Sequence, residues 1–148
     1  MGWINLYGLI IVVLILLPNI LYAIKRKITE NKCHNKAMNI TEQIGRYGSM
    51  FTMVFNIGFY EFGFPSKTVF DVWLISTVLL LLLYWFGWLF YFDSTQFFAA
   101  MLLAIIPSIL FVSNGFLLGN WLLLIFGSIF SVGHIYVTYQ NSRTTEAQ

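Results

Sequence analysis

Long stretches of apolar residues constrain the fold of this chain more than any other feature of its sequence. A helix needs about 20 mostly apolar residues to cross a hydrocarbon core of about 30 Å. Five segments meet this requirement, at residues 6–24, 44–62, 69–92, 97–116 and 118–139. The sequence therefore predicts an all-α integral membrane protein, folded as one membrane domain with a bundle of five transmembrane helices.

The composition favours a bilayer over water as the solvent. Hydrophobic residues make up 59% of the 148 residues and charged residues only 9%, which leaves too little polar surface for a water-soluble domain. Cys33 is the one cysteine, so the chain offers neither an intrachain disulfide nor a cysteine cluster for a metal. We expect no metal and no cofactor.

The distribution of positive charge predicts the topology. Six of the eight basic residues lie between Lys25 and Arg46, and short cytoplasmic loops carry an excess of Lys and Arg. The predicted loop 25–41 is thus cytoplasmic, the N-terminus lies outside and a short tail, 140–148, lies inside. This clustering indicates orientation in a membrane, so nucleic acid is not an expected partner. A bias towards Lys, Asn, Ile and Phe is typical of AT-rich bacterial genomes and favours a multi-pass protein of the bacterial plasma membrane.

Polar residues recur along one side of the second and fifth predicted helices. At helical spacing Glu42, Arg46, Ser49 and Asn56 share one face, and the fifth helix repeats the pattern. Its polar face holds Asn120, Gly127, Ser131, His134 and Thr138. Polar faces of transmembrane helices turn towards the protein interior, so we expect these two faces to meet. Gly127 and Ser131 form a small-residue pair that allows close helix approach. The third segment is the most uniformly apolar, and we expect it to be the most exposed to lipid.

Several of these polar residues lie at a similar depth, a few residues inside the predicted cytoplasmic boundary. They predict a partly hydrated pocket that opens to the cytoplasm and binds a small amphipathic or anionic ligand. The candidate ligand-binding residues are Asn19, Glu42, Arg46, Gln96 and His134, with Asn56 nearer the middle of the bilayer.

Two interpretations of the charged residues stay open. Glu42 precedes Arg46 by four residues, the favoured order for a helical ion pair, so the two charges can neutralise each other at the membrane edge. Alternatively, Arg46 binds the carboxylate or phosphate of a ligand while Glu42 orients it. His134 is either a helix-packing histidine or a proton relay or metal ligand.

No catalytic residues are predicted, because the sequence offers no triad. The leading hypothesis is a small, non-enzymatic membrane protein that binds or passes an amphipathic ligand. One alternative is a membrane enzyme acting on lipidic substrates through Glu42 and Arg46. The other is an accessory subunit whose polar faces contact a partner helix, and a homo-oligomer is a further expectation.

Two resemblances extend this interpretation. The strings Leu17-Pro18-Asn19, Ile106-Pro107-Ser108 and Gly133-His134-Ile135, together with residues 42–48, resemble a group of small uncharacterised five-span bacterial membrane proteins. That resemblance implies an assembly of similar length and no particular activity.

The second resemblance is local. Asn39-x-x-Glu42 is similar to part of the Arg-x-x-x-Asn-x-x-Glu motif in the second helix of the membrane-associated eicosanoid and glutathione metabolism family. That family has four spans, and here Asn35 occupies the place of its arginine. The similarity implies a lipid-active enzyme.

Overall fold

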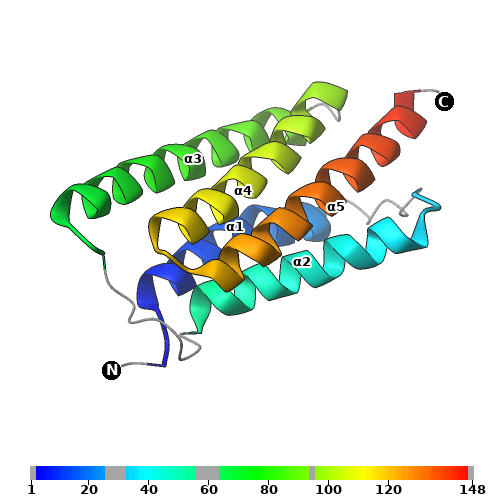
Figure 1. Ribbon diagram of the computed structural model, residues 1–148. Helices are drawn as coiled ribbons and strands as arrows, with labels where there is room; N and C mark the ends of the chain where they lie inside the picture. The colour runs from blue at the N-terminus through cyan, green and yellow to red at the C-terminus, as the bar shows by residue number, and fades with distance from the viewer. Residues whose placement is uncertain (1–2, 26–32, 56–63, 94–95, 147–148) are drawn as a thin grey trace.

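The computed structural model describes residues 3–25, 33–55, 64–93 and 96–146. Within them the chain forms five helices, which confirms the all-α prediction (Figure 1). The helices are α1 (Leu6–Lys25), α2 (Lys36–Val54), α3 (Lys67–Asp93), α4 (Phe97–Leu117) and α5 (Trp121–Glu146). In Figure 1, α1, α3 and α5 run in one direction and α2 and α4 in the other. Four of them, α1, α3, α4 and α5, are long and apolar enough to cross a membrane.

Helix α2 begins eight residues earlier than the predicted segment 44–62 and ends at Val54. Its start falls inside the predicted loop 25–41, because the Asn35 side chain caps the helix by accepting a hydrogen bond from the Met38 amide at 3.2 Å. At the other end Phe55 is extended, and the Asn5 amide donates to the Val54 carbonyl at 2.8 Å. Helix α2 therefore begins before the predicted span and ends at Val54, and residues 56–62 of that span lie outside the described part.

Helix α5 also differs from its prediction. Gly119 adopts φ 63°, a left-handed conformation that glycine tolerates and that commonly ends a helix. Asn120 then caps α5 by accepting a hydrogen bond from the Leu123 amide at 3.0 Å. The helix starts at Trp121, not at residue 118, and continues to Glu146. Most of the predicted tail, 140–148, is thus helical.

The five helices pack in a closed ring. Helix α5 lies between α2 and α4 and has its most extensive contacts with these two, α4 packs on α3, and α1 contacts both α2 and α3 (Figure 1). The ring encloses an apolar core that includes Met53, Leu110, Phe111 and Leu123, all at most 1% exposed. Helix α3 buries the smallest share of its span, 17%, against 56% for α4. As predicted, α3 is the most outward-facing of the four apolar helices.

Glycines set the distance between neighbouring helices. A Cβ on Gly45 of α2 would overlap the Phe130 backbone of α5, and a Cβ on Gly133 of α5 would lie 2.5 Å from the Glu42 nitrogen. On the other side of α5, a Cβ on Gly127 would lie 3.2 Å from the Phe111 backbone of α4. The close approach predicted for Gly127 is therefore present, and α4 is the helix that approaches.

The ends of α1 and α5 and the start of α2 lie at one end of the bundle (Figure 1). This end carries Lys25, Lys36 and Arg143, and we call it the basic end. Lys67 opens α3 at the opposite end.

Candidate functional site

Glu42, Arg46 and His134 come together between α2 and α5. Glu42 is buried, at 5% exposure. Its Oε1 atom forms an ion pair with Arg46 Nη2 and lies 2.9 Å from His134 Nδ1. The prediction that the polar faces of the second and fifth helices meet is confirmed for these three residues.

The local sequence explains why the three side chains meet. Glu42 and Arg46 lie one turn apart on the same face of α2. Gly133 lets the backbone of α5 approach Glu42, and the next residue, His134, then reaches the carboxylate. The imidazole also stacks on Phe130, with ring centroids 4.7 Å apart and an angle of 19° between the planes, which fixes its orientation.

Some hydrogen-bond donors of Arg46 in this cluster are not used by Glu42. A carboxylate only accepts, so His134 Nδ1 carries the hydrogen in this contact. Of the Arg46 donors, Nη2 is the one bonded within the described residues, and 34% of the Arg46 side chain is exposed. The ion-pair interpretation is therefore correct, and it leaves guanidinium N–H groups able to bind a second anion.

Asn19 belongs to a separate contact between α1 and α3. Its side-chain amide donates to the Tyr84 hydroxyl at 2.7 Å and to the Ile15 carbonyl at 2.8 Å. Tyr84 is 3% exposed. Asn19 thus joins α1 to α3, and within the described residues no hydrogen bond joins it to Glu42, Arg46 or His134.

The remaining two candidates are not brought to the cluster. Gln96 precedes α4 in an extended conformation and is exposed, and across the described ranges no hydrogen bond joins its side chain to Glu42, Arg46 or His134. Asn56 lies outside the described residues.

The structure reveals a polar stripe on α3 that the sequence analysis missed. Trp73, Thr77, Tyr84 and Trp88 are all buried and are spaced by four, seven and four residues. Trp73 Nε1 donates to Asn114 Oδ1 of α4 at 2.6 Å, and Asn114 Nδ2 lies 3.4 Å from the Thr77 hydroxyl. The apolar residues between these positions hid the stripe, and its helical spacing was the signal that could have revealed it.

Two buried polar atoms are poorly satisfied, one on α2 and one on α3. Ser49, three residues after Arg46 on α2, is fully buried, and its hydroxyl has no hydrogen-bond partner within the described residues. Trp88 Nε1 is buried close to Tyr84 without a well-formed hydrogen bond. A buried polar group without a partner costs about 1–3 kcal/mol, so such groups mark positions where a water or ligand atom can add a hydrogen bond.

No protein-family model matches the chain, and no curated protein or solved structure is significantly similar to it. The two resemblances noted from the sequence therefore stay predictions. Across the described ranges, no three His, Cys, Asp or Glu side chains lie close enough together to hold a metal ion.

Proposed function

We propose that this protein spans the membrane five times and binds a small anionic amphipathic ligand in a cytoplasm-facing pocket, with Arg46 as the anion-binding residue. The observation that carries the proposal is the state of Arg46. Its charge is held in place by Glu42, a third of its side chain is exposed, and a planar guanidinium recognises carboxylates and phosphates through paired donors.

The surface of α2 supports its role as a membrane span in addition to the four apolar helices. Along this helix Ile40, Ile44, Tyr47 and Phe51 are more than half exposed, whereas Glu42, Ser49 and Thr52 are buried. Apolar residues outside and polar residues inside suit a helix surrounded by hydrocarbon. The 19 residues of α2 extend about 28 Å, close to the thickness of a hydrocarbon core.

The charge distribution supports the orientation. The basic end carries Lys25, Lys36 and Arg143 and the opposite end Lys67, so the positive-inside rule puts the basic end in the cytoplasm. The Glu42–Arg46–His134 cluster lies two to three turns from the start of α2, near that end. A bacterial plasma membrane is the location that fits this topology and the amino-acid bias.

The neighbours of Arg46 favour an anionic headgroup as the bound group. The Ser49 hydroxyl lies three residues after Arg46 on α2 and can donate a hydrogen bond to an anion. The surrounding core is apolar, with Met50 and Val54 packed against it, and suits the apolar part of an amphipathic molecule.

The proposal is tested by identifying small molecules that copurify with the protein in mild detergent, using mass spectrometry. Removing Arg46 alone would leave Glu42 without its cation, so the informative variant is Glu42→Gln/Arg46→Gln, which removes both charges together. Loss of a charged hydrogen bond predicts at least about a tenfold drop in retained ligand. Lys36→Ala is the matched control, since Lys36 is an exposed cation on the same helix.

Retention in the control should equal that of the parent protein. If the double variant folds, as judged by circular dichroism and gel filtration, and still retains the same molecule at the parent level, Arg46 is not the anchor and the proposal fails.

A further inference from the structure

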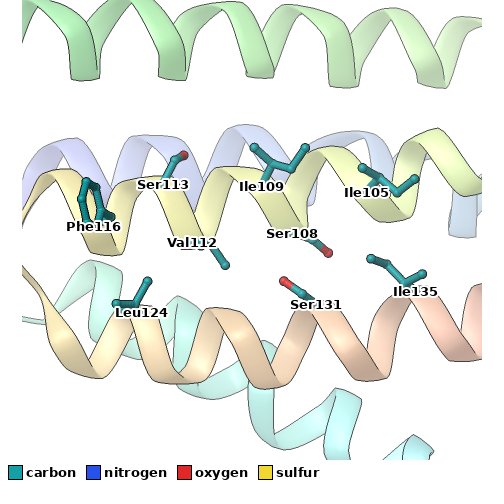
Figure 2. A pocket seen from close by; sticks show the side chains of 9 residues that line it. All are labelled: Ile105, Ser108, Ile109, Val112, Ser113, Phe116, Leu124, Ser131 and Ile135. Carbon is teal, nitrogen blue, oxygen red and sulfur yellow. The ribbon is translucent and has the colours of Figure 1, made fainter.

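A groove of about 450 Å³ runs along the outside of the bundle between α4 and α5 (Figure 2). Apolar side chains from both helices line most of it, including Ile105, Ile109, Val112 and Phe116 of α4 and Leu124 and Ile135 of α5. In Figure 2 the hydroxyls of Ser108 and Ser131 face each other across the space between the two helices.

The three serines that line the groove do not make it polar. Ser108 donates its hydroxyl hydrogen to the Ala104 carbonyl and Ser131 to the Gly127 carbonyl, each at 2.7 Å, and Ser113 donates to the Leu110 carbonyl at 3.1 Å. All three donors are thus satisfied within their own helices, and the groove presents a hydrocarbon surface to an occupant.

The position and direction of the groove suit an acyl chain. Helices α4 and α5 are both long and apolar enough to cross a membrane, and Ile109 and Phe116 at the groove are 49% and 74% exposed. From Ile105 to Phe116 the groove follows α4 for about 17 Å. An occupant would therefore lie parallel to the helices, as lipid chains do.

An arginine lies beyond the basic end of this groove, on the same face of α5. Ile135, Tyr139 and Arg143 follow one another at intervals of four residues. Arg143 Nη1 donates to the Tyr139 hydroxyl at 3.0 Å, and the guanidinium lies 5.4 Å from the centre of the Tyr139 ring. Phe97 of α4 packs edge-on against the same ring at 5.8 Å.

These contacts place an oriented cation about 12 Å beyond Ile135, where the apolar span of α5 ends. That is the level of the headgroups for a lipid whose chain lies in the groove.

We propose that the α4–α5 groove binds an acyl chain of an anionic phospholipid of the cytoplasmic leaflet, with its phosphate at Arg143. This site is separate from the Arg46 pocket, since His134 reaches from α5 towards α2, whereas the groove lies on the α4 side. A second copy of the chain fits less well, because two copies in one membrane share an orientation and would bring their basic ends together.

This site can be tested by native mass spectrometry. The protein is released from nanodiscs that contain equal amounts of phosphatidylglycerol and phosphatidylcholine, and the lipids that it retains are identified. The parent protein should retain phosphatidylglycerol in preference. Ile109→Trp fills the groove and should lower retention of both lipids, whereas Ile125→Trp, an exposed site on α5 outside the groove, should not. Arg143→Ala should reduce the preference for phosphatidylglycerol by about tenfold, and Lys36→Ala should leave it unchanged.

Equal retention in Ile109→Trp and Ile125→Trp would mean that lipid binds only as a general annulus, and the proposed site would be lost. A dimer that Ile109→Trp disrupts would also overturn it, by making the groove an interface between copies. The Glu42→Gln/Arg46→Gln variant should retain phosphatidylglycerol like the parent, so failure of the Arg46 pocket and failure of this groove are distinguishable.

Discussion

Two polar clusters hold the bundle together, and they differ in charge and in completeness. The first joins α3 to α4 through Trp73, Thr77 and Asn114, which are neutral and at most 3% exposed. The second joins α2 to α5 through the Glu42–Arg46 ion pair and the contact of His134 with Glu42. In this cluster the Arg46 side chain is 34% exposed.

The difference separates a packing contact from a candidate binding site. Asn114 Oδ1 accepts from Trp73, and Asn114 Nδ2 donates to the Leu110 carbonyl at 2.8 Å and contacts the Thr77 hydroxyl. Its hydrogen-bonding capacity is used within the protein. Arg46 retains N–H donors, and the nearby Ser49 hydroxyl has no partner within the described part of the chain. Only the charged cluster can bind a ligand without first losing contacts of its own.

The largest effect is expected from Glu42→Ala. It would leave the Arg46 charge without its carboxylate and remove the partner of His134 Nδ1. Breaking a buried ion pair by removing one partner costs about 3–5 kcal/mol, and since a third of Arg46 is exposed, we expect the lower end, about 3 kcal/mol. Chemical unfolding in detergent, followed by circular dichroism, measures the loss.

Glu42→Gln/Arg46→Gln is the matched comparison, because it leaves no unpaired charge. Its free energy of unfolding should lie closer to that of the parent protein. If the single and double variants lose equal stability, the unpaired charge of Arg46 does not account for the cost of Glu42→Ala.

Asn114→Ala should have the next largest effect, at the neutral cluster. It leaves the buried Trp73 Nε1 without its acceptor, and an unpaired buried group costs about 1–3 kcal/mol. Because hydrogen bonds between transmembrane helices average nearer 0.6 kcal/mol, we expect about 1–2 kcal/mol of lost stability. Ligand retention should not change, and a loss of ligand with intact folding would show that the two clusters are not independent.

Helical spacing predicted that the polar faces of α2 and α5 meet. Average hydropathy predicted a span at residues 44–62, whereas α2 runs from Lys36 to Val54. Helical spacing places Glu42 and Arg46 of α2 and His134 of α5 on inward faces, and Gly133 then lets the two helices come close enough for these side chains to meet. The bounds of α2 depend on the Asn35 cap and on the extended Phe55, which pairs with Ile4 as an isolated bridge. A distant partner of this kind leaves no periodic signal in the sequence.

Tertiary contacts also account for what the sequence hid. Tyr84 and Trp88 follow a run of leucines, so α3 looks uniformly apolar until Asn19 and Asn114 are seen to contact its inner face. Gln96 was also predicted to line the pocket, but it precedes α4 in an extended conformation and is exposed.

Ser49→Ala should have the smallest effect on stability and gives the sharpest test of how the clusters differ. The Ser49 hydroxyl is fully buried and has no partner within the described residues. Its removal therefore eliminates an unsatisfied buried polar group and breaks no hydrogen bond. We expect the free energy of unfolding to stay the same or rise by up to about 1 kcal/mol. The copurified ligand should nevertheless fall by about fivefold, the effect of one neutral hydrogen bond of about 1 kcal/mol.

Thr77→Ala is the control from the neutral cluster, since Thr77 contacts Asn114. It should lose a few tenths of a kcal/mol to about 1 kcal/mol of stability and no ligand. A Ser49→Ala protein that is less stable than the parent but retains its ligand would assign Ser49 to packing. The charged cluster would then differ from the neutral one only in its charges and in the spare donors of Arg46, and Ser49 would drop out of the proposed binding site.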